Sequence, residues 1–150
     1  MITVATPEQI LFVAENMRED DWREVVADSR LATAQEIAAA CKALPCVVYA
    51  ALADGVPVAV GGVARNEPGV AQAWLFGTRQ IGRCKIEIAH LVRRLTRHAW
   101  QDGLEVQARS AAFHTRAHRW LNSMGFRKAS VLGGYGLGGE DFVVFSMRGE

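Results

Sequence analysis

The sequence lacks any apolar run that approaches the ~20 residues a membrane-spanning helix needs, although half of its 150 residues are hydrophobic. Its first residues, Met1 to Pro7, lack the basic start and apolar block of a secretory signal peptide. We therefore expect a protein that is not embedded in a membrane and that resides in the cytoplasm.

Cysteine is scarce, which argues against a fold built on disulfides. The three cysteines, Cys41, Cys46 and Cys84, form an odd set without metal-ligand spacing. We expect reduced thiols, as in a cytosol-like compartment. Linkers, internal repeats and low-complexity tracts are also absent from the sequence. We therefore expect residues 1–150 to form a single domain with a substantial core.

The net charge of +1 conceals an asymmetry along the chain. Residues 1–75 carry five Lys and Arg against ten Asp and Glu, whereas residues 76–128 carry eleven against three. A basic second half suits an anionic ligand or nucleic acid. Only this charge supports nucleic-acid binding, which is the weaker expectation. Solvated halves, or halves that face each other, remain an open alternative.

Local patterns predict a mixed α/β arrangement after a short N-terminal strand. Helices are expected at residues 6–17, 33–44, after Gly82 and at about 113–124, and strands at 46–52, 56–65, 70–78, 104–109, 127–132 and 142–147. Thr6-Pro7 is typical of a helix start, Asp54-Gly55 of a hairpin turn and Gly125 of a helix end. This order contains two strand–helix–strand passages.

The stretch Thr78 to Lys85 is the most informative part of the sequence. An apolar strand turns here into a long helix through a loop that contains Gly82. Such a turn directs several backbone N–H groups, and the positive end of the helix dipole, at one spot that favours a phosphate or pyrophosphate. Arg79, Arg83 and Lys85 surround the spot with cations. A plain strand-to-helix turn with a solvated basic flank is the alternative.

The segment from Arg79 to Cys84 resembles the signature Gln/Arg-x-x-Gly-x-Gly/Ala of the GCN5-related N-acetyltransferase superfamily. Arg79 and Gly82 match this signature, and Cys84 is a small but unusual last member. The resemblance extends over nearly the whole chain. It implies a mixed, mostly antiparallel central sheet of about six to seven strands flanked by about four helices.

Residues 114–126 are similar to that superfamily's later pattern Asn-x-x-Ala-x-x-x-Tyr-x-x-x-Gly-Phe. Ala117, Gly125 and Phe126 fit the pattern, whereas His114 replaces the Asn and Leu121 replaces the Tyr. A narrower resemblance is to a divergent phage-encoded branch of acetyltransferase-like or small internal virion proteins. The segments that carry this narrower resemblance are 16–21, 54–59, 74–78 and 120–126.

The resemblance implies transfer of an acetyl group from acetyl-CoA, as co-substrate, to a primary amine. It implies a cofactor-binding segment made of Phe76, Gly77, Thr78, Arg79, Gln80, Ile81, Gly82, Arg83, Cys84 and Lys85. A backbone N–H near Phe76 or Gly77 is expected to stabilise the oxyanion that develops on the thioester, because Gly77 permits an irregular strand geometry.

The expected proton donor is absent, because Leu121 has no ionisable group. Loss of a general acid costs ~10²–10⁴-fold in rate. His114 and Ser110 are the expected catalytic substitutes, with Tyr135 also within reach, and His114 ranks first because an unperturbed imidazole titrates near neutrality. A helix-start histidine bonded to backbone is the alternative for His114. A His114–His118 metal pair lacks a third ligand, so no metal is expected.

Two functions therefore remain open. The first is an N-acetyltransferase with a degenerate active site that acts on a small-molecule or protein amine. A homo-oligomer is compatible with this function. The second is a catalytically silent protein that keeps the scaffold, binds phage virion components and resides in the host cytoplasm or the virion. The acidic side chains of residues 19–28 are expected to form a solvated helix flank or, alternatively, to hold a cationic amine.

Overall fold

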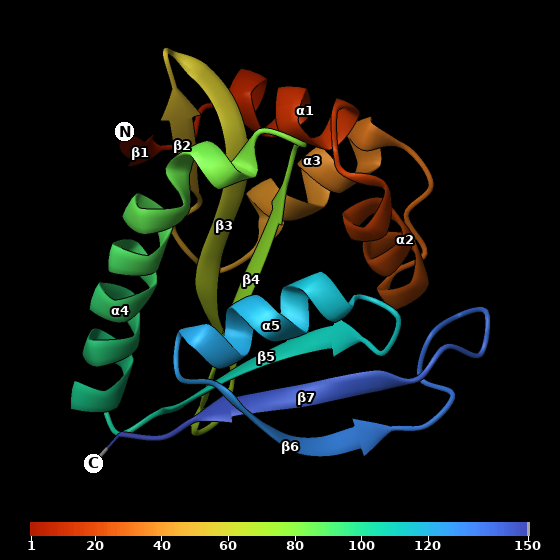
Figure 1. Cartoon of the computed structure of the whole chain (residues 1–150), viewed down its shortest axis with the longest axis vertical. Helices are drawn as coiled ribbons and strands as arrows, with labels where there is room; N and C mark the ends of the chain where they lie inside the picture. Colours follow the sequence, from red (N-terminus) through yellow and green to blue (C-terminus); the bar gives the residue numbers. More distant parts are fainter. Residues whose placement is uncertain (150) are drawn as a thin grey trace.

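A twisted seven-stranded sheet runs through the protein and has helices on both of its faces (Figure 1). The computed structural model describes residues 1–149. In sheet order the strands are β1 (Ile2–Val4), β2 (Tyr49–Ala53), β3 (Val56–Glu67), β4 (Val70–Gly77), β5 (Glu105–Ala111), β7 (Phe142–Met147) and β6 (Arg127–Leu132). All neighbours are antiparallel except β4 and β5, which are parallel. The predicted mixed, mostly antiparallel sheet is confirmed.

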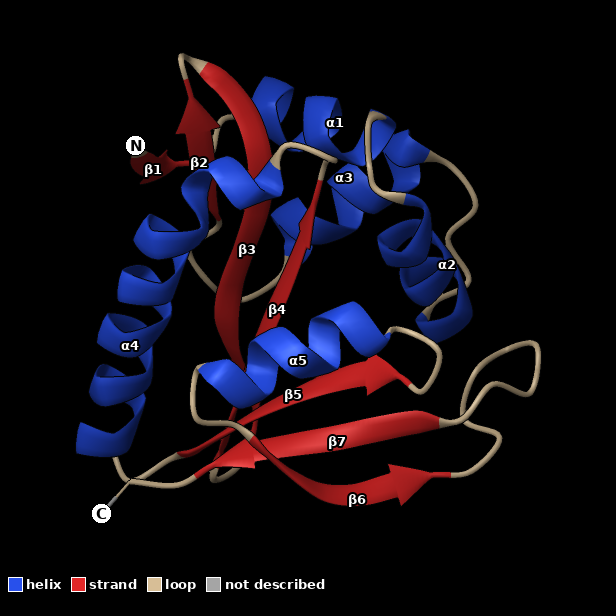
Figure 2. Cartoon of the chain, viewed as in Figure 1, coloured by secondary structure: helices blue, strands red, loops and turns tan. Residues whose placement is uncertain are grey.

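Five α-helices and one short 3₁₀ helix complete the described chain (Figure 2). They are α1 (Pro7–Glu15), α2 (Glu19–Asp28), α3 (Ala34–Ala43), η1 (Ile81–Cys84), α4 (Lys85–Gln101) and α5 (Thr115–Ser123). Helices α1 and α3 pack on β2–β4 through one apolar cluster, whereas α4 and α5 pack on the sheet through two others. No described helix has the length and apolarity to cross a membrane.

Local sequence chemistry explains the ends of several elements. The Thr6 hydroxyl and the Gln9 side chain each bond the other residue's backbone N–H, which forms a capping box at the start of α1. Asp54 and Gly55 both adopt positive φ in the β2–β3 hairpin, the geometry of a type I′ turn. Gly125 takes a φ of 104° just after α5. These predicted boundaries are confirmed.

Helix α2 is the main departure from the predicted element order. Three helices, rather than two, precede the sheet meander, because the acidic run that begins at Glu19 folds into the first turn of a helix. Negative side chains are favoured there by the helix dipole. Strand β2 also begins at Tyr49 rather than at Cys46, since a turn closes α3 at Cys46, whose N–H bonds the carbonyl of Leu44.

Strands β4 and β5 diverge along their length. Their pairing covers Val70–Gln72 and Glu105–Gln107 and then stops, although both strands continue. In Figure 1 the sheet accordingly has two parts, β1–β4 and β5–β7–β6, which run at an angle to each other. The divergence opens a space between two strand ends at the middle of the sheet.

Replacement of Gly61 by Ala tests how tightly β3 and β4 pack. A Cβ at Gly61 would lie 2.5 Å from the carbonyl oxygen of Trp74, a backbone atom that cannot rotate away. We expect Gly61→Ala to lower the free energy of unfolding by about 1–3 kcal/mol in urea titrations. Gly82→Ala is the control, because a Cβ there would meet no atom within 4 Å. Equal stability of the two variants would contradict this packing.

Candidate functional site

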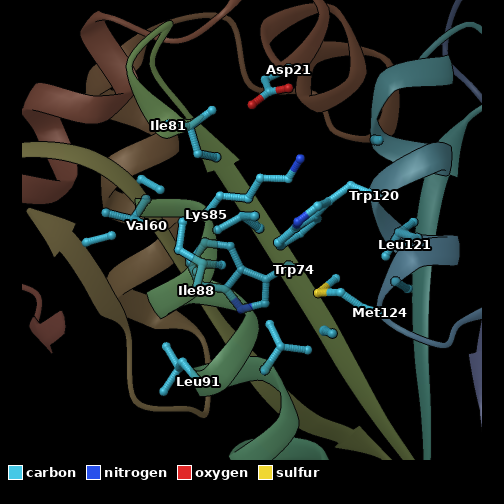
Figure 3. Close-up of a pocket in the computed structure, with 18 of the residues that line it drawn as sticks. Asp21, Val60, Trp74, Ile81, Lys85, Ile88, Leu91, Trp120, Leu121 and Met124 are labelled. Carbon is cyan, nitrogen blue, oxygen red and sulfur yellow. The ribbon is translucent and has the colours of Figure 1, made fainter. Parts of the chain in front are cut away.

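A cavity of about 660 Å³ occupies the space between the diverging strands (Figure 3). Its walls come from β2–β5, the η1–α4 segment, α5 and α2. In the close-up, Lys85 extends across the cavity from α4, and Asp21 lies at its α2 end. Leu121 faces the cavity from α5 and Met124 from just after that helix. The cavity therefore has a mostly apolar body with charged groups toward its α2 end.

The backbone of β4 presents one edge to this cavity. Because the Thr78 N–H bonds the carbonyl of Val58, even-numbered residues of β4 face β3, and odd-numbered residues face β5 by alternation. Beyond the last β4–β5 pair, the carbonyl of Ala73 and the N–H of Leu75 therefore point into the divergence. This edge is the part of β4 that an extended ligand can pair with.

Helix α2 closes the far end of the same edge. The Gly77 N–H donates to Asp21 Oδ2 at 2.8 Å, and the Gly77 carbonyl accepts from the backbone N–H of Arg18 at 2.8 Å. Phe76 faces β3 opposite Val60. Both N–H groups expected to stabilise an oxyanion are thus directed elsewhere, and the Leu75 N–H is the next donor that faces the cavity.

Glu24 performs the corresponding role at the end of β5. Its Oε1 accepts the Ala111 N–H at 2.6 Å and the Ser110 hydroxyl at 2.7 Å. Glu24 and Asp21 are three residues apart on α2, so they lie on the same face of the helix. One turn of helix therefore holds the ends of two separated strands.

Asp21 is a buried carboxylate with several partners. It is 3% exposed, and the guanidinium of Arg18 pairs with both of its oxygens at 2.9–3.2 Å. The ring of His114, 2% exposed, places Nε2 at 2.6 Å from Asp21 Oδ1. The predicted solvated acidic flank is thus wrong for this residue, because its carboxylate is desolvated and fully bonded.

His114 uses both ring nitrogens inside the protein. Its Nδ1 accepts the Ala117 N–H at 3.4 Å as the N-cap of α5, which fixes Nδ1 as an acceptor. The ring proton therefore lies on Nε2 and is donated to Asp21. Both predicted catalytic side chains, Ser110 and His114, line the cavity. His114 has no ring nitrogen free to contact a ligand, because both are hydrogen-bonded within the protein. The hydroxyl of Ser110 is therefore the better placed of the two to exchange a proton with a ligand.

Burial raises the pKa of the Glu24 carboxyl above its ordinary value, more than the hydrogen bonds from Ser110 and Ala111 lower it. No described Lys, Arg or His forms an ion pair with Glu24. Glu24 differs in this respect from Asp21, whose charge is compensated by the guanidinium of Arg18.

Basic groups line the cavity beside the α2 end. Arg79, Gly82 and Lys85 line it at the η1–α4 segment, and Arg116 and Arg119 line it from α5. A Cβ built at Gly82 would meet no atom within 4 Å, so the backbone is bare toward the cavity. Together with the helix N-terminus, these groups can hold an anion.

The remaining residues of the predicted cofactor segment lie elsewhere. Ile81 also lines the cavity, but Phe76, Gly77, Thr78, Gln80, Arg83 and Cys84 are not among its lining residues. Arg83 pairs with Asp54 at 2.5 Å, and Cys84 is buried with its Sγ 3.5 Å from the Leu52 carbonyl oxygen. The side chain of Phe76 packs into the core beneath α1 and α3.

Tyr135 and His118, which the sequence also singled out, lie outside the cavity lining. The Tyr135 ring packs on Phe142 and under the guanidinium of Arg109. His118 bonds the Ala111 carbonyl through Nε2 at 2.9 Å. Among residues 1–149, no group of three or more His, Cys, Asp or Glu side chains is placed to hold a metal ion.

Sequence patterns did not reveal the pairing of α2 with the strand ends. The acidic run from Glu19 to Asp21, followed by the apolar Trp22 and Val25, carries a signal for a helix start. That signal locates the helix but not the strands beneath it. Which carboxylates are buried depends on the three-dimensional arrangement of β4 and β5.

Replacement of Asp21 by Asn tests the buried network. The substitution leaves the guanidinium of Arg18 without its anionic partner in a site where it is mostly buried. We expect a loss of about 3–5 kcal/mol in the free energy of unfolding, measured by urea denaturation. Asp20→Asn is the control, because its pair with Arg23 is exposed and worth ~1 kcal/mol or less. Similar losses in the two variants would contradict a buried network.

Glu24→Gln tests the desolvation of this carboxyl through the pH dependence of stability. The pKa of Glu24 is higher in the folded protein than its ordinary value of 4.5. Its protonation therefore adds to the free energy of unfolding, in full below pH 4.5, and this stabilisation is lost as pH rises through the folded-state pKa. We expect wild type to gain stability relative to Glu24→Gln as pH falls from 7 toward 4.5, measured by urea denaturation. The exposed Glu19, replaced by Gln, should show no such trend. A flat difference for Glu24→Gln would contradict the burial.

No protein-family model matches the sequence, and no curated protein matches it significantly. Solved structures do match it. An N-acetyltransferase from Staphylococcus aureus Mu50 superposes with a TM-score of 0.74 at 15% identity, covering 99% of this chain and 97% of that one. A ribosomal-protein-alanine N-acetyltransferase from Brucella melitensis gives 0.72 at 14% identity, covering 99% of both chains.

A third match is yncA from Salmonella typhimurium, solved with its cofactor acetyl-CoA. It gives a TM-score of 0.70 at 14% identity and covers 99% of this chain and 92% of that one. At these identities the similarity establishes architecture. The chain therefore has the GCN5-related N-acetyltransferase fold.

Proposed function

We propose that the protein is an acyl-CoA-dependent N-acyltransferase that moves an acetyl group from acetyl-CoA to a primary amine. The observation that carries this proposal is the divergence of β4 and β5, which exposes a backbone edge beside a basic helix N-terminus in one cavity. The matched structure solved with acetyl-CoA supports the choice of co-substrate.

The residues present fit a nucleotide thiol carrier. The backbone around Gly82 and the side chains of Arg79 and Lys85 would hold its pyrophosphate, because bare amides and cations converge there. The apolar walls from α4 and α5, including Ile88 and Leu121, would enclose its arm. Arg116 and Arg119 add positive charge along the same wall. Acetyl-CoA would supply an acetyl group activated as a thioester.

The Leu75 N–H would stabilise the negative charge that develops on the acyl oxygen. It replaces the N–H groups of Phe76 and Gly77 in this role, since Asp21 occupies the Gly77 N–H and Phe76 faces β3. One well-placed donor of this kind is worth ~3 kcal/mol to the barrier. Because it belongs to the backbone, it tolerates divergence of the side chains.

Ser110 would donate the proton to the departing sulfur, in place of the missing tyrosine. Its hydroxyl lies in the cavity and is held by Glu24 at 2.7 Å. We assign His114 a positioning role, because its ring orients Asp21 and caps α5. Leu121, 8% exposed, contributes only apolar surface at its position.

The acceptor in this proposal is a primary amine on a small molecule or a protein. Matches that include ribosomal-protein alanine N-acetyltransferases from Brucella melitensis and Escherichia coli support a protein amine as one class of acceptor. The cavity itself favours neither class. Phage origin is a hypothesis that depends on the resemblance in sequence, whereas cytoplasmic location depends on the expectation of reduced thiols.

The second candidate is a catalytically silent protein of the same fold, such as a phage internal virion protein. The apolar Leu121 at the position of the family's acid favours this candidate. It predicts copurification with particles or a larger assembly and no response to acetyl-CoA. A monomer that binds acetyl-CoA and occurs in no assembly would contradict it.

Acetyl-CoA is expected to raise the melting temperature, because a ligand that binds only the folded state stabilises it. At about a hundred times the dissociation constant the gain is ~2.7 kcal/mol, or roughly 5–10 °C for a chain of this size. Differential scanning fluorimetry measures the shift. Gly82→Asp should abolish it by placing a carboxylate where phosphate binds, whereas Gly82→Ala should preserve it.

Two results would contradict the proposed cofactor site. An unchanged melting temperature of the wild-type protein with millimolar acetyl-CoA would remove the proposed function. A full shift in Gly82→Asp would place the cofactor away from the η1–α4 segment.

A further inference from the structure

The two oxygens of Glu24 have different surroundings. Oε1 accepts two hydrogen bonds, from the Ser110 hydroxyl and the Ala111 N–H, whereas Oε2 has no partner among the described residues. Glu24 nevertheless lines the cavity. The carboxyl group is therefore held rigidly by one oxygen while the other remains available to a ligand.

The cations near Glu24 are committed to other partners. Arg18 forms a bidentate pair with Asp21, and Arg109 lies 3.8 Å from Asp28 with its guanidinium over the Tyr135 ring. Arg23 lies over the ring of Phe113, 4.1 Å from its centre. Within residues 1–149, Glu24 is thus a partly buried carboxylate without a counterion.

We propose that Glu24 binds the ammonium group of the acceptor and takes its proton, so that the substrate is a primary amine that is cationic at neutral pH. The proposal rests on the proposed function and deepens it. A positively charged amine supplies the counterion that the site lacks, and it must lose a proton before its nitrogen can attack.

The charged groups that face Glu24 are consistent with this role. Asp21, on the same helix, raises the pKa of Glu24, although less than burial does. The ring of His114, at the start of α5, donates its proton to Asp21. Ser110 on β5 contributes a neutral hydroxyl. The substrate's ammonium would therefore be the strongest positive charge beside Oε2.

The proton balance of the step closes with these groups. Glu24 accepts one N–H proton from the ammonium, and the nitrogen lone pair forms the C–N bond while the C–S bond breaks. The hydroxyl of Ser110 gives its proton to the departing sulfur and regains one from solvent. The proton on Glu24 and the second N–H proton leave to solvent, so one proton net is released for each acetyl group transferred.

Two amine probes separate this role from a structural one. n-Butylamine is cationic at neutral pH and must be deprotonated, whereas hydroxylamine is uncharged there and needs no base. Acetyl transfer to each is measured with wild type, Glu24→Gln and, as a control, Glu19→Gln on the exposed side of α2. The shift in melting temperature with acetyl-CoA is recorded for all three proteins.

We expect Glu24→Gln to lower kcat/KM for n-butylamine by about 10²–10⁴-fold and to lower that for hydroxylamine far less. Its residual n-butylamine rate should rise with pH in proportion to the unprotonated amine. Glu19→Gln should match wild type with both probes.

Three results would overturn the role of Glu24. The first is that Glu24→Gln loses activity toward both amines to the same extent, and the second is that it loses activity toward neither. The third is that the wild-type protein is stabilised by acetyl-CoA but transfers acetyl to neither amine. The last result would leave the cofactor site standing. If acetyl-CoA does not stabilise the wild-type protein, that result would instead contradict the proposed function itself.

Discussion

The binding of two strand ends by one turn of α2 is the interaction on which the rest of the site depends. Parallel strands normally satisfy each other's backbone groups, and a buried N–H without a partner costs as much as a lost hydrogen bond. Here Asp21 bonds the Gly77 N–H and Glu24 bonds the Ala111 N–H, across strands that no longer pair. The strands can therefore diverge without leaving these two N–H groups unpaired.

The same arrangement places two carboxylates in a desolvated setting and treats them differently. Arg18 compensates the charge of Asp21, and His114 fixes its orientation. Glu24 receives only neutral donors. Burying an unpaired charge is unfavourable for stability, and uncompensated carboxylates in cavities are frequent at functional sites. This difference in charge compensation suits Asp21 to a structural role and Glu24 to the proposed catalytic role.

Much of the fold was predictable because local chemistry determines it. The capping box at Thr6, the Asp54-Gly55 turn and the Gly125 helix end each depend on residues close in sequence. The basic turn at Gly82 was likewise visible, and Arg79, Gly82 and Lys85 do line the cavity.

What could not be predicted depends on contacts between distant residues. Asp21 and Gly77 lie 56 positions apart, and Glu24 and Ser110 lie 86 apart. A carboxylate that caps a strand end and one that faces solvent look alike in sequence. For the same reason the role of Gly77 could not be foreseen, since its N–H is occupied by a side chain from another element.

Amide hydrogen exchange measured residue by residue, with and without acetyl-CoA, tests the open strand edge most directly. In the free protein the amides of Gly77 and Ala111 should already be protected by α2, and acetyl-CoA should slow exchange chiefly at Leu75 and in the turn around Gly82. Rapid exchange at Gly77 and Ala111, or a cofactor that binds without protecting Leu75, would show that the diverging strands do not form the acyl-binding edge.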